Sequence, residues 1–299
     1  MARVFFVTGF NRSGTTLVTS AVTEATGGAT LTAGHLARYI PTLDRFLVTA
    51  KKRGLAPDRG VDRLPVSEST PEEYGWLLQT LTGEPAFGEG AAQSGVLAQL
   101  IEEVAGGQQR ANGSEPVVVL KNPWDTGREQ LLLGHVEGAV ALLVRRRLGA
   151  IEDSQARAWS RMATSNRYLR ALIPDRRRAG EILSSVLDPA ARQRMIRANN
   201  RQTRRDVLRL ARLLPMLPLD RVAFLSYDEL RSDPRAGAAW AAHLLDPEAV
   251  AKAVAAHSFP EYNHEARGSL LVRAIDRYWA RAWRRARAQQ VKAGILAPP

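Results

Sequence analysis

The chain has 299 residues, and its 42 Lys and Arg residues outnumber its 30 Asp and Glu residues, which gives a formal net charge of +12 at pH 7. Hydrophobic residues make up 45% of the chain and charged residues 24%, a globular composition that excludes wholesale disorder, collagen and a coiled-coil fibre. The positive charge attracts polyanions in general, but it does not choose between nucleic acid, an acidic membrane surface and a phosphorylated small molecule.

Four short apolar runs predict buried parallel strands, at residues 4–8, 117–120, 139–144 and 222–226. Long stretches with helical spacing follow or separate them, at residues 151–172, 189–214 and 270–287. Strands that alternate with helices favour a layered α/β domain with a parallel sheet. Right-handed crossovers then gather the loops after the strands at one edge of the sheet, where ligands of such folds bind.

Residues 33–115 are too many for a single crossover between strands, and they contain helix-like patches separated by turn-rich segments. We interpret them as a helical insertion, an acceptor-binding wall or lid, within a single domain of residues 1–299. Residues 268–291 predict an amphipathic C-terminal helix whose apolar stripe packs on the core, with a homodimer face or an anionic-lipid contact as alternatives.

No apolar run approaches the roughly 18 residues that cross a bilayer, so we expect no stable membrane insertion. The N-terminus lacks the charged region, long apolar region and cleavage site of an export signal. The chain has no cysteine. These observations together favour a cytoplasmic protein.

The strongest motif follows the first predicted strand. Residues 9–16 read Gly-Phe-Asn-Arg-Ser-Gly-Thr-Thr and lead into a helix with apolar periodicity, which is the strand-loop-helix context of a phosphate-binding loop. Gly9 and Gly14 let the backbone wrap an anion closely, and the N–H groups at the helix start face it. The predicted phosphate-binding residues are Asn11, Arg12, Ser13, Gly14, Thr15 and Thr16.

The loop departs from that of an NTPase, because Thr15 stands where such a loop has a lysine and the cation is Arg12 instead. A magnesium-dependent NTPase also needs an Asp at the end of an apolar strand, and Asp228 is the nearest candidate. We therefore expect cationic, metal-independent chemistry, with a P-loop kinase or NTPase acting on a small molecule as the alternative.

These residues resemble the sulfotransferases that use 3'-phosphoadenosine 5'-phosphosulfate (PAPS). The run from Arg12 to Thr16 is similar to the R-S-G-T-T form of that family's 5'-phosphosulfate loop, and further motifs follow in the same order up to about residue 270. The resemblance implies a three-layer α/β domain with a central parallel sheet, related to nucleotide kinases. It also implies PAPS as donor, adenosine 3',5'-bisphosphate as product and a small-molecule hydroxyl as acceptor.

The resemblance extends to the residues that hold the 3'-phosphate. Arg146, at the end of the third predicted strand, and Ser154, eight residues later, match an Arg and Ser pair of the family. A guanidinium and a hydroxyl can converge on one dianion. The neighbouring Arg145 and Arg147 leave open which arginine takes this role.

Two weaker matches complete the implied donor site. Tyr227, after the fourth predicted strand, matches a tyrosine that lies near the nucleotide in the family. Arg267 and Gly268 resemble the basic element that completes the 3'-phosphate cradle.

Transfer of a sulfuryl group needs cations near the leaving oxygens and a base for the acceptor proton. Arg12 and Lys121 are the predicted cations, the latter because its Lys-Asn-Pro context resembles the family's catalytic lysine. His35 is the predicted base, since Gly34-His35 stands where the R-S-G-T-T branch usually has Gly-Glu. Other candidates for the base are Asp44, Glu68, Glu72 and Glu73.

The arginines in residues 189–214 offer a different function, a module that binds nucleic acid. Aromatic residues that stack on bases are nearly absent from this stretch, so we expect no nucleic-acid partner. The remaining histidines lack the spacing of metal ligands, so no metal site is predicted; they are His135, His243, His257 and His264.

Overall fold

The computed structural model describes residues 2–55, 57, 59, 65–108, 115–257 and 268–297. Its centre is a sheet of five strands in the order β2-β3-β1-β4-β5, and every neighbouring pair is parallel. The strands are β1 (Arg3–Thr8), β2 (Ala29–Thr30), β3 (Val117–Lys121), β4 (Val140–Arg145) and β5 (Val222–Ser226). The predicted α/β fold with a central parallel sheet is confirmed. β2 escaped prediction because two residues are too few for a pattern.

Both faces of the sheet are buried, which explains why the strands read as continuous apolar runs. Along β1, Val4 and Phe6 belong to one hydrophobic cluster, whereas Phe5 and Val7 belong to the other. This alternation is the two-residue period of a strand, and it divides the core into two layers. Helices therefore pack on each side, which gives three layers.

The face that holds Phe5 and Val7 is covered by four helices. They are α1 (Thr15–Thr26), α12 (Tyr227–Ser232), α13 (Pro234–Ala239) and α14 (Pro247–Ala256). The side chains of Asp233 and Asp246 cap α13 and α14, each followed by a proline at the first helical position. These caps fix where the two short helices begin.

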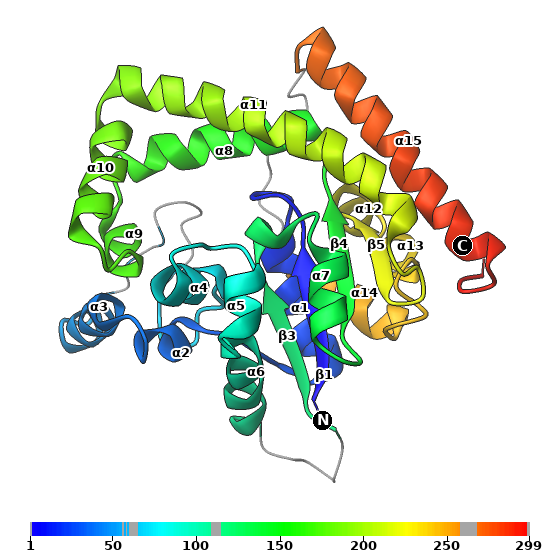
Figure 1. Cartoon of the computed structure of the whole chain (residues 1–299), viewed down its shortest axis with the longest axis horizontal. Coiled ribbons are helices and arrows are strands. Elements are labelled where there is room, and N and C mark those ends of the chain that lie inside the picture. The colour runs from blue at the N-terminus through cyan, green and yellow to red at the C-terminus, as the bar shows by residue number, and fades with distance from the viewer. Residues whose placement is uncertain are drawn as a thin grey trace.

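The opposite face packs against α7 (Glu129–His135), α11 (Pro189–Leu213) and α15 (Leu270–Lys292), with the short η3 (Leu214–Met216) after α11. In Figure 1 α11 runs across the upper part of the molecule, and α15, which contacts it, lies at the side of β5. In α15, Ile275, Trp279 and Trp283 are buried, while Leu271 and Tyr278 are exposed. Most of the predicted apolar stripe therefore packs on the core, and a homodimer stays a prediction.

Two helices replace the single helical stretch expected at residues 151–172. α8 (Leu148–Met162) ends before a turn at residues 163–166, and α9 (Arg167–Leu172) follows it. The turn contains Thr164, Ser165 and Asn166, whose side chains compete for backbone hydrogen bonds and so favour turns. α10 (Arg176–Leu187) then leads to α11, which lies beside α8 (Figure 1).

The predicted insertion contains α2 (Ala33–Ala37), α3 (Pro41–Lys52), α4 (Gly75–Thr82), α5 (Glu89–Gln93) and α6 (Val96–Gly106). Its first part is closed at the base by main-chain contacts: Glu72 N–H donates to Leu31 O over 2.9 Å, and Thr32 pairs with Pro71. Glu73 then pairs in parallel with Lys121 at the end of β3. After this closed first part of the insertion, the chain thus reaches the edge of the sheet where the strands end.

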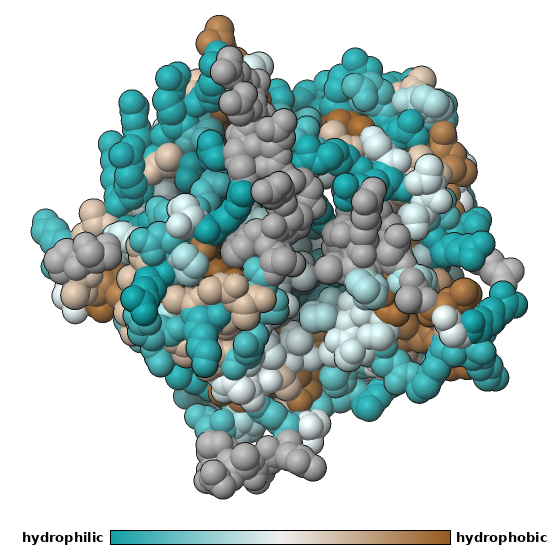
Figure 2. Space-filling model, turned by 180° about the vertical axis from the view of Figure 1, so that it is seen from behind, coloured by the Kyte–Doolittle hydropathy of each residue, from teal (hydrophilic) through white to brown (hydrophobic). Residues whose placement is uncertain are grey.

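No helix in the described part of the chain is both long and apolar enough to cross a bilayer. Figure 2 shows one face of the molecule, where hydrophilic side chains dominate and hydrophobic ones form small separate patches.

Candidate functional site

The loop between β1 and α1 owes its shape to two glycines with positive φ. A Cβ on Gly14, at φ 100°, would lie 2.1 Å from a ring carbon of Tyr227. A Cβ on Gly9, at φ 143°, would lie 2.6 Å from the carbonyl oxygen of Val144. The loop can therefore approach the ends of β4 and β5 only because these two positions carry no side chain.

Arg12 is the one non-glycine residue with positive φ in the described part of the chain, at 76°. Two contacts hold this unusual conformation: Arg146 donates to Arg12 O over 2.9 Å, and Arg12 Nε donates to Ser154 Oγ over 3.2 Å. Left-handed backbone at a non-glycine residue costs about 1–2 kcal/mol, and it concentrates at functional sites. No side chain among the described residues caps α1, so its first N–H groups remain for a ligand.

A cavity of about 580 Å³ opens beside this loop. Among the residues predicted from the sequence, its lining includes Asn11, Arg12, Gly14, Thr15, Thr16, Arg146 and Tyr227. Ser13, within the loop, and Ser154, beside it, are buried and do not line the cavity, and the Ser13 hydroxyl has no hydrogen-bond partner among the described residues. Gly268 does not line it, and Arg267 lies outside the described residues.

The three consecutive arginines after β4 point to three different places. Arg145 forms an ion pair with Asp276 over 3.1 Å, and Arg147 forms one with Asp228 over 3.5 Å. Arg146 alone of the three lines the cavity, with its guanidinium 4.6 Å from the centre of the Tyr227 ring. The structure thus places Arg146, rather than its neighbours, at the loop.

Asp228, the nearest candidate in the sequence for an acidic magnesium ligand, forms the ion pair with Arg147. The strands on either side of β1 end in Lys121 and Arg145, and Asp228 is paired with Arg147 outside the cavity lining. These two strands thus end in a basic residue, whereas a magnesium-dependent NTPase has an Asp at a strand end.

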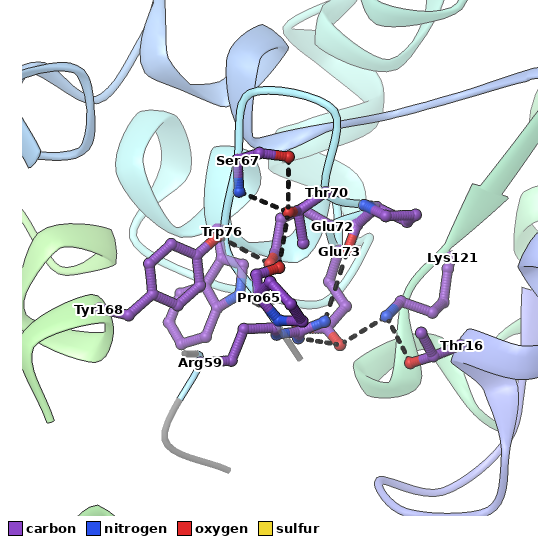
Figure 3. A network of polar contacts seen from close by, with 11 residues as sticks. Thr16, Arg59, Pro65, Ser67, Thr70, Glu72, Glu73, Trp76, Lys121 and Tyr168 are labelled. Carbon is purple, nitrogen blue, oxygen red and sulfur yellow. Dashed lines mark hydrogen bonds and ion pairs between the residues drawn. The ribbon is translucent and has the colours of Figure 1, made fainter. Parts of the chain in front are cut away.

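Lys121 is completely buried at the end of β3 and does not itself line the cavity. Its Nζ lies 3.0 Å from Thr16 Oγ1 and 3.0 Å from Glu73 Oε1, so it joins the predicted phosphate loop to a carboxylate of the insertion that does line the cavity. A buried ammonium needs a counter-charge, and Glu73 supplies it. Figure 3 shows Lys121 between these two groups.

Glu73 lines the cavity and is contacted by two further side chains. Trp76 Nε1 donates to its Oε2 over 3.1 Å, and Arg59 Nη2 lies 3.8 Å from its Oε1 (Figure 3). Burial acts to raise the pKa of Glu73, but the cations Lys121 and Arg59 outweigh it and lower that pKa. Glu73 is therefore an ionised carboxylate near neutral pH.

The preceding residue, Glu72, has the opposite electrostatics. It is fully buried, accepts a hydrogen bond from Tyr168 OH over 2.7 Å, and lies 3.5 Å from Arg59 Nε. Burial raises the pKa of Glu72, and the charge of Glu73 adds to the effect. The surroundings thus shift the pKa values of two adjacent carboxyl groups, Glu72 and Glu73, in opposite directions. This arrangement is typical of sites that move protons.

His35, the predicted base, does not line the cavity, and its catalytic role stays a prediction. Its Nδ1 accepts the backbone N–H of Thr32 over 3.2 Å and lies 2.9 Å from Thr32 Oγ1, which forms a capping box at the start of α2. Burial lowers the pKa of His35. The ring therefore closes a helix end, and Glu73, one of the alternative candidates, stands at the cavity instead.

A large part of the remaining lining is aromatic and aliphatic, and we call this part the aromatic wall: Leu17, Trp76, Trp124, Ala158, Trp159, Met162, Tyr168, Leu169 and Leu172. The other lining residues are Ser20, Arg59, Pro123, Gln155, Asn199 and His257. Trp76 and Trp124 meet edge to face, with ring centres 5.1 Å apart. Trp124 belongs to η2 (Pro123–Asp125), which Asp125 anchors by accepting hydrogen bonds from Tyr74 OH, Asn122 Nδ2 and the N–H of Phe87. The predicted insertion thus supplies only part of the wall.

Several of these residues were not anticipated from the sequence. Gln155 donates to Asn11 O over 3.2 Å and accepts from Asn199 over 2.9 Å, which ties α8 and α11 to the loop. Trp124 stands three residues after Lys121, and that short distance to a predicted site residue was the available signal. Trp159 and Tyr168 carry no sequence signal that separates them from core residues.

The chain resembles solved sulfotransferases in structure. Sulfotransferase STF1 from Mycobacterium tuberculosis matches with a TM-score of 0.52 and 19% identity, over 94% of this chain and 77% of that chain. Sulfotransferase STF9 from Mycobacterium avium matches with a TM-score of 0.46 and 17% identity, over 98% and 76%. No protein-family model and no curated protein matches the sequence. The likeness to STF1 shows that the chain has a sulfotransferase fold.

Proposed function

We propose that the protein transfers the sulfuryl group of PAPS to a hydroxyl of a small-molecule acceptor. The observation that carries the proposal is the position of Lys121, which contacts both Thr16 of the phosphate loop and the carboxylate of Glu73. The donor phosphate would thus lie on the Thr16 side of the buried Lys121, and the acceptor's proton on its Glu73 side.

The donor fits the loop side of the cavity. The N–H groups at the start of α1 and the Arg12 guanidinium suit the 5'-phosphosulfate, and the buried Ser13 hydroxyl has no partner within the described part of the chain. We assign the 3'-phosphate to Arg146 with Ser154, and the neighbourhood of the nucleotide to Tyr227, which lies against both Arg146 and Gly14. Arg267 and Gly268 stay predictions.

The proposed reaction forms a bond between the acceptor oxygen and sulfur while the bond from sulfur to the 5'-phosphate oxygen breaks, leaving its electron pair on the phosphate. Glu73 accepts the acceptor proton, because it is a partly open carboxylate held in its ionised form. Lys121 and Arg12 offset the charge that develops on the leaving oxygen. Each well-placed cation contributes about 2–4 kcal/mol to such a barrier reduction.

Titration calorimetry with adenosine 3',5'-bisphosphate, without metal, tests the proposal. We expect tight binding by the wild type and a loss of at least about tenfold in Arg146→Ala and in Arg12→Ala, because each removes a charged contact to phosphate. Arg147→Ala is the matched control, since Arg147 is half exposed and paired with Asp228 outside the cavity lining. Its affinity should equal that of the wild type.

A parallel titration with ATP and Mg²⁺ addresses the kinase alternative. Preference for magnesium ATP over the bisphosphate would overturn the proposed function. Equal losses in Arg146→Ala and Arg147→Ala would overturn the assignment of Arg146.

A further inference from the structure

Two helices carry the whole positive charge of the chain. α11 has eight arginines and one aspartate, and α15 has six arginines, one lysine and one aspartate. The two helices therefore carry a formal charge of +7 and +6, or +13 together, whereas the whole chain carries +12. The rest of the chain has a formal charge of −1, so the excess is concentrated in one part of the molecule rather than spread over its surface.

Most of the arginines of α11 lie on its outward face. Exposed arginines repeat every three or four residues along this helix, which is the spacing of a single stripe. The first and the last are 18 residues, or about five turns, apart. On the other side of the helix Thr203, Val207 and Leu210 are buried. The arginines of the stripe are Arg194, Arg197, Arg201, Arg205, Arg209 and Arg212.

α15 is built in the same way. Its side chains at Ile275, Trp279 and Trp283 are buried, and its cations lie on the opposite, exposed side. α11 and α15 contact each other and bury residues in the same hydrophobic cluster, so both exposed sides point away from that cluster. We call these two sides together the basic face. It consists of the stripe of α11 and of Arg273, Arg277, Arg281, Arg284, Arg285 and Lys292.

No ion pair among the described residues joins the basic face to an acidic side chain. The paired arginines of these helices belong to their inner sides, where Arg204 contacts Glu152 and Arg287 contacts Glu229. Like charges four residues apart in a helix repel each other, and a solvated helix face commonly alternates its charges. The basic face is therefore complementary to an anionic surface, which would offset this repulsion.

The basic face also carries exposed apolar side chains at one end. α15 begins with Leu270 and Leu271, which are 76% and 58% exposed, and Tyr278 is exposed further along the same side. In Figure 1 the first turn of α15 lies at the top of the molecule, and Figure 2 shows hydrophobic side chains at the same end. Arg273 and Arg277 follow the two leucines on this side of the helix.

This combination favours a lipid surface over a nucleic acid. A bilayer with anionic lipids presents negative headgroups with an apolar layer directly beneath them, so it can take up arginines and leucines at the same time. A nucleic acid offers phosphates and base rings, but α11 has no aromatic residue, and Tyr278 is the one exposed aromatic side chain that the structure describes on α15. Exposed leucines gain nothing from a phosphate backbone.

We propose that α11 and α15 dock the protein on the surface of a bilayer that contains anionic lipids. The arginines of the basic face lie at the headgroups, and Leu270 and Leu271 enter the interfacial layer. The docked protein rests on the bilayer and does not span it. No residue of the basic face lines the cavity, so the inference goes beyond the proposed function and does not depend on it.

Sedimentation with vesicles tests the proposal. We expect the wild type to sediment with vesicles of equal amounts of phosphatidylglycerol and phosphatidylcholine, and to stay in solution with phosphatidylcholine alone. Binding should weaken as salt is raised, because the Debye length falls from about 10 Å at 0.1 M to about 3 Å at 1 M. Equal binding to both kinds of vesicle would overturn the proposal.

The charge variant replaces three exposed arginines of α15 together, as Arg277→Gln, Arg281→Gln and Arg285→Gln. Each arginine near an anionic surface contributes about fivefold to binding, so the triple variant should bind phosphatidylglycerol vesicles about 100-fold more weakly. Its thermal unfolding should match that of the wild type, because the three side chains are exposed.

The matched control removes the same charge from α3, which lies on the other side of the molecule in Figure 1. Lys51→Gln, Lys52→Gln and Arg53→Gln change three exposed cations that are not part of the basic face. This variant should lose less than about threefold in vesicle binding, since those charges lie far from the docked surface. Equal losses in the two triple variants would mean that net charge, rather than the basic face, governs binding.

The leucines separate a bilayer from other anionic partners. Leu270→Ser with Leu271→Ser leaves the charge unchanged and should weaken vesicle binding by about tenfold or more, because two apolar side chains no longer enter the interfacial layer. Leu81→Ser with Leu131→Ser is the control, since these exposed leucines belong to α4 and α7. The control should bind vesicles like the wild type.

Two results would assign the basic face to another partner and overturn the proposal. One is tighter binding to a DNA duplex than to phosphatidylglycerol vesicles at equal salt, with no effect of the leucine variant on either. The other is a dimer in solution, seen by analytical ultracentrifugation, that the leucine variant dissociates. Failure of adenosine 3',5'-bisphosphate to bind would remove the proposed function and leave the vesicle result standing.

Discussion

The two sides of the cavity are built by different means. The loop side comes from consecutive residues, 9–16, and its shape depends on backbone conformation: positive φ at Gly9, Arg12 and Gly14, and N–H groups at the start of α1. The opposite side, which we propose binds the acceptor, is assembled from side chains of the insertion, η2, α8 and α9, which are far apart in the sequence. One side is therefore shaped by the local backbone, whereas the other depends on long-range packing.

The largest effect should come from the carboxylate where the two sides meet. Glu73→Gln keeps the shape of the side chain but removes the proton acceptor, so turnover should fall by about 100-fold or more. Bisphosphate affinity should change little, because Glu73 reaches the loop only through Lys121. Turnover is measured with an acceptor that the wild type sulfates, and calorimetry reports the affinity.

His35→Gln provides the matched comparison for that variant. The His35 ring closes the start of α2 through Thr32, outside the cavity lining, so turnover should stay within about threefold of the wild type. A large loss in His35→Gln with normal turnover in Glu73→Gln would reverse the assignment of the base.

The second-largest effect concerns the loop after β1, whose backbone shape we expect to depend on Gly14. Gly14→Ala introduces a Cβ against Tyr227 as well as strain at φ 100°, whereas Gly27→Ala, at φ 59°, meets no atom within 4 Å. We expect Gly27→Ala to cost about 1–2 kcal/mol of unfolding free energy and Gly14→Ala about 2 kcal/mol more. Denaturant unfolding measures both.

Titration of the same two glycine variants with adenosine 3',5'-bisphosphate separates an effect on ligand affinity from an effect on folding stability. Only Gly14→Ala should lose affinity, because the displaced Tyr227 ring lies on Arg146. Equal affinities in the two variants would mean that the close approach of Gly14 to Tyr227 has no part in binding.

The smallest effect concerns the charges around Glu73, which are Lys121, Arg59 and Glu72, with Tyr168 bonded to Glu72. The value of kcat/KM should fall as pH drops through the pKa of Glu73, since a protonated carboxyl accepts no proton. Arg59→Met removes a cation that lowers this pKa, so the fall should begin at a higher pH. At pH 7 the rate should change by less than about threefold, because Glu73 remains ionised.

Glu72→Gln is the control for the pH profile. The pKa of Glu72 is raised, so it is already uncharged at the acidic pH where Glu73 titrates, and the variant should leave the acid limb in place. A shift in Glu72→Gln as large as that in Arg59→Met would show that the limb does not report the charge of Arg59.

The sequence predicted the part of the molecule that is encoded locally. Apolar runs located four of the five strands, because a strand buried on both faces leaves an uninterrupted signal. The spacing of Gly9, Arg12 and Gly14 marked the loop after β1, and all three residues have positive φ in the structure. The choice between Arg145, Arg146 and Arg147 needed the structure, since partners such as Asp276 are distant in sequence.

The opposite side of the cavity could be predicted only in part, because its residues are brought together by tertiary contacts. The sequence offered both His35 and Glu73 as candidates for the base, and only the pairing of residue 73 with Lys121 shows that Glu73 lies at the cavity. Trp159 and Tyr168 look like core residues in the sequence, and only the break between α8 and α9 and their packing place them at the cavity.

The main-chain contacts among Leu31, Glu72 and Lys121 have a consequence for how this protein can change. Residues 33–70 leave and return at one closed junction, and the entropy cost of such an excursion grows only slowly with its length. A longer or shorter segment could be exchanged there without moving Glu73 out of register with β3. This segment carries Arg59, which contacts Glu73. Replacing the segment would therefore change the pKa of Glu73, the proposed proton acceptor, while Lys121 stays in place beside it.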